Sequence, residues 1–246
     1  MLVKEVVASI PSPGRFRRGV SGALALWLAL CGGLRAGEID AVTFDAEPGR
    51  IYLPLDEAAR EFGWTVRRDE LGGLWLNERP VARAAIRRLL DTTALVATEA
   101  LERAGAVPAP DTAGKAEWLG EHGRVSARVG PKRVVVSLRE QRLRAWQGGR
   151  LVLFCRISSG RRGATPPGEF VAGPYKARMH RSSRYHNAPM PWSVQVNGHV
   201  FIHGFTSVPR YPASHGCIRL PLDEGNPARF FYEWIDRGTP VTVTRE

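Results

Sequence analysis

A dense group of histidines precedes a cysteine in the C-terminal half of the sequence. Five of the six histidines lie between residues 180 and 215, and Cys217 follows closely. An imidazole titrates near neutral pH, so it can take the proton of a neighbouring thiol and turn the sulfur into a nucleophile. The resulting thiolate and imidazolium stabilise each other, and His203 and Cys217 could form such a pair. These residues predict nucleophilic chemistry at Cys217.

The elements around this pair have the patterns of a hairpin and a loop. Residues 192–196 and 199–202 flank Asn197-Gly198, a dipeptide that favours a type I′ turn, so they predict a β-hairpin whose second strand ends at His203. The segment 214–219 follows a proline-rich stretch, which favours an exposed loop over a buried strand. The nucleophile is therefore expected on a loop, and the histidine at the end of a strand.

Two motifs in this region resemble the signature of the L,D-transpeptidases, cysteine enzymes that cross-link peptidoglycan. They are Ile202-His203-Gly204 and Ala213-Ser214-His215-Gly216-Cys217-Ile218-Arg219-Leu220, and the resemblance extends over residues 131–244. It implies Cys217 as the nucleophile, His203 as the general base and His215 as an auxiliary catalytic residue. It further implies that Ser214 and Gly216 support the loop. The backbone around His215, Gly216 and Cys217 would supply amide donors to the oxyanion. Arg219 corresponds to an arginine that holds the loop or meets a substrate carboxylate.

The resemblance also implies a substrate and a reaction. Cys217 would attack the carbonyl of the third residue of a tetrapeptide stem, release D-alanine and hold the stem as a thioester. An amine would then accept the stem, from a neighbouring stem, a free D-amino acid or an envelope protein, and water as acceptor would give an L,D-carboxypeptidase. No cofactor, no metal and no nucleic acid is expected, and the protein is expected to be a monomer. Candidate residues of the substrate groove are Met190, Trp192, Phe205 and Tyr211.

Three other interpretations of Cys217 are open at this point. A disulfide with Cys155 is one, although Cys155 ends an apolar run and resembles a core thiol. A zinc site with His186, His203 and His215 is another, but the spacing matches no metal motif. The third is a wall-binding module with a vestigial site. The complete motif argues against it, because no residue of the motif is missing.

The composition is that of an ordinary globular protein. The chain has 246 residues, 43% of them hydrophobic, with a net charge of +11 and three cysteines. Three cysteines without a Cys-x-x-Cys pair exclude a disulfide scaffold. Residues 1–36 contain arginines, an uncharged run over 20–30 and then small residues, which predicts a signal peptide and an exported protein of the periplasm or cell envelope. Whether Cys31 is lipidated stays open. Without residues 1–36 the charge is +7, which suits an anionic wall or membrane surface better than nucleic acid.

Residues 38–112 predict a small α/β domain with a two-fold repeat. Asp56 and Thr98 are expected to cap two short helices that end at Gly63 and Gly105, at a constant offset of 42 residues. An apolar strand precedes each helix. The segment resembles the small N-terminal domain of copper amine oxidases, but it contains no histidine and no cysteine, so no metal site is expected in it. Residues 113–130 are expected to be a linker.

Residues 131–244 predict a mainly β catalytic domain, a sandwich or barrel with one short C-terminal helix. Short apolar runs at 134–136, 143–146 and 151–154 are separated by turn residues, which is typical of successive hairpins. Asn226 and Pro227 have the pattern of a helix start, and Gly238 marks its end. Residues 241–243 then alternate as a final strand.

Overall fold

The computed structural model describes residues 37–110, 116–121 and 123–246. The expected signal peptide, with Cys31, lies outside these residues. Within the described residues, no helix has the length and apolarity needed to cross a membrane. The secondary structure is mostly strand, so the expected mainly β architecture with one short C-terminal helix is confirmed.

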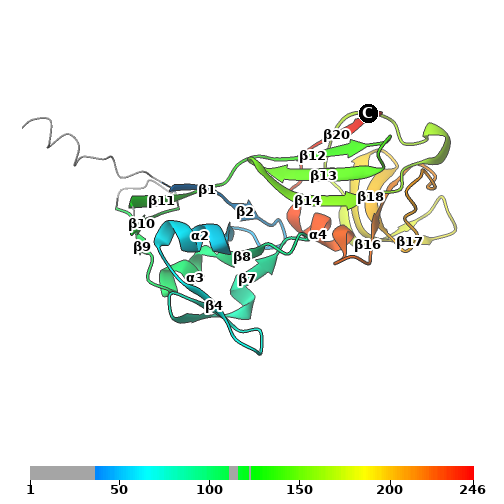
Figure 1. The fold of residues 1–246 in the computed structure, drawn as a ribbon. Helices are drawn as coiled ribbons and strands as arrows, with labels where there is room; N and C mark the ends of the chain where they lie inside the picture. Colours follow the sequence, from blue (N-terminus) through cyan, green and yellow to red (C-terminus); the bar gives the residue numbers. More distant parts are fainter. Residues whose placement is uncertain (1–36, 111–115, 122) are drawn as a thin grey trace, which may run out of the picture. The chain divides into compact units, whose positions relative to one another are not determined.

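Residues 37–128 combine three small sheets with two short helices (Figure 1). The first sheet consists, in spatial order, of β1 (Gly37–Asp40), β11 (Gly123–Arg128), β10 (Glu117–Gly120) and β9 (Val107–Pro108). The second consists of β2 (Val42–Thr43), β3 (Ile51–Pro54), β8 (Ala94–Ala97) and β7 (Ile86–Arg88), and the third of β4 (Val66–Arg68), β5 (Leu74–Leu76) and β6 (Arg79–Val81). Helices α2 (Leu55–Phe62) and α3 (Thr98–Arg103) follow β3 and β8 directly, and a 3₁₀ turn, η1 (Arg83–Ala85), precedes β7.

The two helices end as expected but begin differently. Gly63 is the left-handed C-cap of α2, and Gly105, with a φ of 113°, follows the end of α3. Asp56 and Thr98, however, are not N-caps. Both lie inside the first turn of their helices, and no side chain caps either helix. The reason is that each strand runs straight into its helix, which leaves no separate capping position between them.

Residues 117–120 and 123–128, inside the expected linker, form strands instead. Strands β10 and β11 are an antiparallel hairpin, and β11 pairs in parallel with β1. Trp118 and Val125 face each other in this hairpin, and both are buried. The Trp118 ring packs edge-on against the Phe62 ring, with centroids 6.3 Å apart. The hairpin is therefore held in the N-terminal part of the fold by its own apolar side chains. Residues 111–115 and 122 lie outside the described structure.

A five-stranded sheet begins the C-terminal part of the chain. Its members, in spatial order, are β14 (Arg150–Arg156), β13 (Arg142–Gln147), β12 (Lys132–Ser137), β20 (Pro240–Thr244) and β15 (Gly168–Val171). The expected hairpins are confirmed, because β12, β13 and β14 are successive antiparallel neighbours. The last strand, β20, pairs in parallel with β12 and thus lies near the middle of the sheet. A 3₁₀ turn, η2 (Arg161–Gly163), follows β14.

A second sheet carries the predicted site residues. It contains β16 (Lys176–Ser182), β17 (Ala188–Asn197), β18 (Val200–Phe205) and β19 (Ile218–Pro221), in that order. The hairpin expected around Asn197-Gly198 is confirmed, but a bulge between Gln195 and Asn197 shifts its register. The turn residues are therefore Gly198 and His199. Only Gly198 has a positive φ, 49°, whereas a type I′ turn needs two such residues, so the expected turn type is wrong.

Helix α4 (Pro227–Trp234) packs against strands of both sheets, β14 of the first and β17, β18 and β19 of the second. It begins as expected, with the side-chain oxygen of Asn226 accepting a hydrogen bond from the Arg229 N–H at 3.0 Å. Phe231 and Trp234 are fully buried. The helix thus forms the hydrophobic support behind the sheet that carries the site.

Ion pairs and hydrogen bonds join residues 37–128 to the C-terminal part. The Arg87 guanidinium bonds Glu47 at 3.0 Å and Glu233 of α4 at 2.9 Å. The side chain of Gln147 accepts from the Thr43 N–H at 3.0 Å and from the Trp234 indole at 3.3 Å. Helix α4 is therefore tied to the N-terminal part by charged and neutral contacts.

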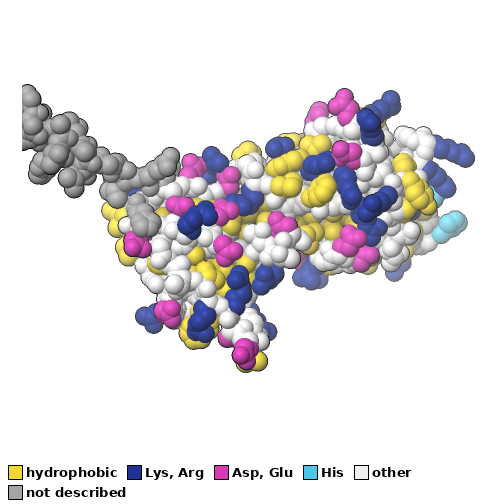
Figure 2. All heavy atoms as spheres, viewed as in Figure 1, with side chains coloured by type: hydrophobic (Ala, Val, Ile, Leu, Met, Phe, Trp, Pro, Cys, Tyr) yellow, Lys and Arg dark blue, Asp and Glu magenta, His cyan; other side chains and the backbone are white. Residues whose placement is uncertain are grey.

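The outer face of the five-stranded sheet alternates basic and aromatic side chains. Arg133 stacks on Trp146 at 4.1 Å, and Arg144 stacks on Phe154 at 5.0 Å. Figure 2 shows hydrophobic and basic side chains side by side over β12 to β14. These guanidinium groups cover part of the apolar rings, and Phe154 remains 50% exposed.

Candidate active site

The parallel pairing of β18 and β19 brings the predicted catalytic residues together. His203 lies opposite Arg219 in this register, and Cys217 immediately precedes β19. Because side chains alternate along a strand, His203 shares a face of the sheet with Cys217 and Arg219. His203 lies within β18, which continues to Phe205, rather than at the strand end as expected. A crossover loop over residues 206–217 accounts for the sequence separation, since parallel neighbours need a connection of this kind.

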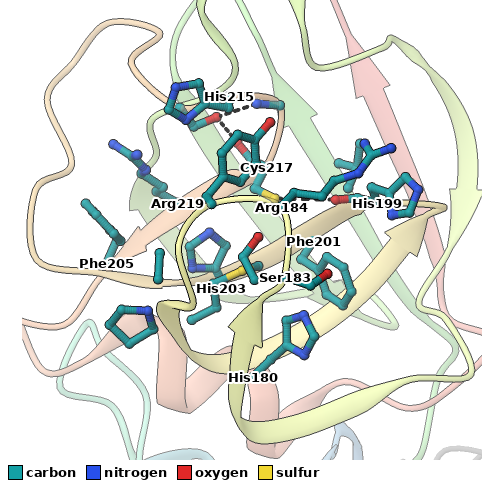
Figure 3. Close-up of a pocket in the computed structure, with 18 of the residues that line it drawn as sticks. His180, Ser183, Arg184, His199, Phe201, His203, Phe205, His215, Cys217 and Arg219 are labelled. Atoms are coloured by element: carbon teal, nitrogen blue, oxygen red, sulfur yellow. Dashed lines mark hydrogen bonds between the residues drawn. The ribbon is translucent and has the colours of Figure 1, made fainter.

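This face forms one wall of a cavity of about 440 Å³. Figure 3 shows Cys217, His203, Arg219 and Phe205 around it, with His180 of β16 and Ser183 and Arg184 of the following turn on another side. The lining residues are Ala164, His180, Ser182, Ser183, Arg184, Tyr185, Ala188, Pro189, Met190, His199, Val200, Phe201, His203, Phe205, Ser214, His215, Gly216, Cys217 and Arg219.

The loop that carries Cys217 is braced from behind by residues 158–165. Ser158 and Arg219 exchange two backbone hydrogen bonds, at 3.0 and 3.1 Å. The hydroxyl of Thr165 accepts from the Gly160 N–H at 2.7 Å and donates to the Gly216 carbonyl at 2.7 Å. Thr165 is buried, so these bonds are shielded from water. The position of the nucleophile is thus set by a second segment of the chain.

Ser214 and Gly216 shape the loop from within. The Ser214 hydroxyl donates to the Cys217 carbonyl at 2.5 Å and accepts from the Gly216 N–H at 3.0 Å. Gly216 has a φ of 142°, which a residue with a Cβ rarely adopts. Since its N–H already has a partner, Gly216 supports the loop and is not a free oxyanion donor, contrary to the expectation. In the described structure the N–H groups of His215 and Cys217 have no such intramolecular bond.

The Cys217 thiol is half-buried. Its sulfur lies 3.6 Å from the His199 carbonyl oxygen, to which the S–H donates. Burial raises the pKa of the Cys217 thiol, and a backbone hydrogen bond from Phe201 and the charge of Arg219 offset only part of this increase. The resting side chain is therefore a neutral thiol near pH 7.

The His203 imidazole is buried and neutral. Its Nδ1 lies 2.8 Å from the Gly204 carbonyl oxygen, an acceptor, so Nδ1 carries the proton and Nε2 is the basic nitrogen. Burial lowers the pKa of His203 to about 4; the Gly204 hydrogen bond offsets part of this decrease, and the positive charge of Arg219 adds to it. Burial thus disfavours both charged forms, so the pKa shifts favour a neutral thiol and a neutral imidazole at rest over the thiolate–imidazolium pair.

Residues 131–243 match the model of the L,D-transpeptidase catalytic domain. This segment belongs to the L,D-transpeptidase catalytic domain family. Members of the family are L,D-transpeptidases, which act on the stem peptides of peptidoglycan in the cell wall.

Several solved structures are similar to this chain. An L,D-transpeptidase from Stackebrandtia nassauensis is 26% identical, with a TM-score of 0.42, over 46% of this chain and 55% of its own. One from Xylanimonas cellulosilytica is 30% identical, with a TM-score of 0.40, over 48% of this chain and 62% of its own. The chain thus spans less than two thirds of either structure. One from Mycobacterium smegmatis is 15% identical, with a TM-score of 0.42, over 85% of this chain and 94% of its own. No curated protein matches the chain.

His215 lies at the mouth of the L,D-transpeptidase cavity, where it is exposed. Its Nε2 bonds the Arg161 guanidinium, and its ring stacks on that of Tyr185 at 4.5 Å. Its side-chain partners are thus rim residues, not Cys217 or His203. The geometry places His215 where it can position the loop or the substrate.

Arg219 occupies the wall of the cavity next to His203. Its guanidinium stacks on the Phe205 ring at 4.0 Å, and its backbone is held between β18 and Ser158. Its charge favours the thiolate form of Cys217 and disfavours an imidazolium at His203. Arg219 therefore contributes to the electrostatic balance between the two predicted catalytic groups of the L,D-transpeptidase domain.

Two of the four expected groove residues line the cavity and two do not. Met190 and Phe205 line it. Trp192 instead packs on Tyr232 of α4, with ring centroids 5.6 Å apart. Tyr211 is 64% exposed, and its backbone carbonyl accepts a hydrogen bond from the Ser158 hydroxyl at 2.8 Å.

Three residues of the site were not predicted from the sequence: Thr165, Arg184 and Tyr185. Arg184 and Tyr185 end a basic stretch beside the histidine cluster, and the lack of any acidic residue over 176–187 was the available signal. Thr165 gave no signal, because its role depends on a contact between segments that are distant in the sequence.

The disulfide and zinc interpretations of Cys217 can be compared with the described structure. Cys155 and Cys217 are both free thiols. Cys155 is buried in β14, as expected of a core residue, and burial raises its pKa to about 12. Across the described ranges, no three or more His, Cys, Asp or Glu side chains are grouped so that they could hold a metal ion.

Proposed function

We propose that the chain is an exported L,D-transpeptidase that cross-links peptidoglycan stems, or joins them to another amine, through a thioester on Cys217. The observation that carries this proposal is the placement of Cys217 and His203 on one face of a single cavity. The basic Nε2 of His203 is free of the Gly204 bond and so can accept the thiol proton.

In the first half-reaction, Cys217 attacks the carbonyl carbon of the third stem residue. The thiol proton passes to Nε2 of His203 as the C–S bond forms, because neither a free thiolate nor an imidazolium is stable in this buried site. His203 then gives this proton to the departing amine of D-alanine. The C–N bond breaks, and the stem remains as a thioester.

In the second half-reaction, the acceptor amine attacks the thioester. His203 takes a proton from the amine and returns one to the sulfur as the C–S bond breaks, so the enzyme is regenerated. No ATP is needed, since the thioester conserves the energy of the broken amide. Water in place of the amine gives L,D-carboxypeptidase activity at the same site.

Backbone groups of the nucleophile loop are suited to stabilise the oxyanion. The N–H groups of His215 and Cys217 have no partner within the described structure, whereas that of Gly216 bonds Ser214. Removal of one oxyanion donor typically costs about 2.7–4 kcal/mol of transition-state stabilisation. The positive Arg219 lies on the same wall and favours the developing negative charge.

Acylation by a carbapenem tests the nucleophile directly. Wild-type protein is expected to gain the mass of one carbapenem, and the Cys217→Ala variant is expected to gain none. Cys155→Ala is the matched control, because this thiol is buried in β14 and should leave the adduct unchanged. Intact-protein mass spectrometry reads the result. A wild-type protein without an adduct would favour a catalytically inactive wall-binding protein.

Muropeptide analysis tests the reaction. Incubation of wild-type protein with tetrapeptide-rich sacculi is expected to release D-alanine and to form cross-links that the Cys217→Ala variant does not form. Tripeptide stems without cross-links would identify an L,D-carboxypeptidase instead. Cross-links formed by Cys217→Ala would contradict the assignment of the nucleophile.

A further inference from the structure

We infer that Arg184 selects donor stems that carry a free carboxylate over stems in which that group is a carboxamide. The inference rests on the proposed function, because it concerns which donor the Cys217 cavity accepts. It is carried by the charge of the cavity wall and by the position and bonding of Arg184.

The cavity wall is basic. Two arginines and four histidines line it, and none of its lining residues within the described structure is Asp or Glu. The segment over 176–187, which forms one side of the cavity, also contains no acidic residue. A wall of this composition attracts an anionic ligand and offers no competing carboxylate.

Arg184 is the cation on this wall that has no protein partner in the described ranges. The Arg219 guanidinium is stacked on Phe205, and Arg161 at the rim bonds His215. Arg184 is exposed, lines the cavity, and forms no hydrogen bond, ion pair or ring contact with the described residues. Its donors are therefore free for a ligand.

The turn that carries Arg184 is fixed to the nucleophile loop. The adjacent residue, Tyr185, stacks on His215 with an interplanar angle of 18°. Within the turn, the Tyr185 and Asn187 N–H groups donate to the Ser182 carbonyl at 3.2 and 3.1 Å. In Figure 3, Arg184 and Arg219 flank Cys217. A stem bound at Cys217 therefore passes a turn whose backbone is held and whose Arg184 guanidinium is free to bind it.

A guanidinium distinguishes a carboxylate from a carboxamide. It can donate two parallel hydrogen bonds to the two oxygens of a carboxylate, and the opposite charges strengthen both. A carboxamide has one acceptor oxygen and no charge, and its NH₂ group faces the donors of the arginine. Amidation of the recognised group is thus expected to weaken binding at this point of the cavity.

The test uses synthetic tetrapeptide donors with a diaminopimelate third residue. One donor has all carboxylates free, one is amidated at the second residue, and one is amidated on the diaminopimelate side chain. We expect wild-type kcat/KM to be roughly tenfold higher for the free donor than for at least one of the amidated donors. Arg184→Gln should remove most of this preference, mainly by slowing the free donor, and Arg184→Lys should retain part of it.

Arg162→Gln is the matched control. Arg162 is an exposed arginine of η2 that does not line the cavity, so its loss changes the net charge equally and should leave the preference unchanged. An Arg184→Gln variant that keeps the preference, or that slows all three donors equally, would overturn the inference. A preference lost equally in Arg162→Gln would overturn it as well, because net charge would then be the cause.

Binding to the Cys217→Ala variant separates this inference from the proposed function. Calorimetry should show that the Cys217→Ala variant binds the free donor more tightly than the amidated donors. In the double variant that also carries Arg184→Gln, this difference in affinity should be absent. If wild-type protein turns over no donor but this binding difference is present, the inference stands and the proposed function fails. If donors are turned over without a dependence on Arg184, the function stands and the inference fails. If no donor binds, both fail.

Discussion

At the residue scale, the site combines a nucleophile and a base that are both neutral at rest. Burial raises the pKa of Cys217 and lowers that of His203, so an ion pair is disfavoured before substrate binds. The hydrogen bond from His203 Nδ1 to Gly204 selects the tautomer in which Nε2 is basic. Proton transfer in the proposed reaction is consequently coupled to attack on the carbonyl.

The His203 pKa of about 4 predicts the acid limb of the activity profile. Carbapenem acylation of Cys217 should persist as the pH falls below the ordinary histidine pKa of 6.5 and should be lost near pH 4, where His203 becomes protonated. Mass spectrometry of the adduct over a pH series measures this. An acid limb near pH 6.5 would show that the imidazole is accessible to water.

The same shift affects stability. Between pH 6.5 and about 4 the unfolded chain binds a proton at His203 and the folded chain does not, so the free energy of unfolding should decrease as the pH falls through this window. The contribution is at most about 3 kcal/mol. A His203→Gln variant should lose this part of the pH dependence, and urea titrations of both proteins provide the comparison.

At the scale of elements, one segment determines where the nucleophile lies. Residues 158–165 hold the Cys217 loop through the Ser158–Arg219 backbone pair and through the hydroxyl of Thr165. Gly160 approaches Gly216 so closely that a Cβ on Gly160 would lie 2.9 Å from the Gly216 Cα. Strand β19 and its preceding loop are thus positioned from two sides, by β18 and by this segment.

The pair Thr165→Val and Thr165→Ser tests this support. Valine has the shape of threonine but leaves the buried Gly160 N–H and Gly216 carbonyl without their partner, which should lower the free energy of unfolding by about 2 kcal/mol. Carbapenem acylation of Cys217 should also become slower. Serine keeps the hydroxyl, so its acylation rate should remain near that of the wild type. Equal acylation rates in both variants would exclude a role for these hydrogen bonds.

At the scale of the whole molecule, helix α4 links the site to the N-terminal part of the chain. It packs behind β17, β18 and β19, and Glu233 on it bonds Arg87 from β7. Burial raises the pKa of both Glu47 and Glu233, but the hydrogen bonds from Arg87 and its neighbours outweigh this and lower both values below 4.5. The ion pairs that link these two parts of the chain therefore exist only in the folded state.

Replacement of Arg87 tests this connection. Arg87→Met leaves Glu47 and Glu233 without their shared partner, which should lower the free energy of unfolding by about 2 kcal/mol at neutral pH. In the wild type, the stabilisation from these carboxylates should be lost as the pH falls below 4.5 through their lowered pKa values, and the variant should show a smaller loss. Urea titrations at pH 7 and pH 4 measure both effects.

Arg88→Met is the control for Arg87→Met. Arg88 is the exposed neighbour, and among the described residues its side chain bonds only the Thr92 carbonyl, at 3.3 Å. Its replacement should change the free energy of unfolding by less than about 0.5 kcal/mol. Similar losses in the two variants would indicate that the paired charges do not connect the two parts.

The sequence alone indicated which side chains are the candidate nucleophile and base, and which secondary-structure elements surround them. The two motifs around His203 and Cys217 are sufficient by themselves to indicate the family. Apolar runs predicted β12, β13 and β14, and Asn226 and Pro227 predicted the start of α4. These features are local: a hairpin or a helix start depends on residues that are neighbours in the chain, so the sequence carries the signal.

Only the tertiary structure decided the environment of those groups. The charge states of Cys217 and His203 depend on burial, and the pairing of β18 with β19 depends on a long crossover, so neither follows from local spacing. The same holds for Trp192, which faces α4 and not the cavity, and for Thr165, whose role arises only where residues 158–165 meet the Cys217 loop. Residue types define which reactions are possible, while solvent exclusion and contacts between distant segments set the proton positions and the groups that surround the substrate.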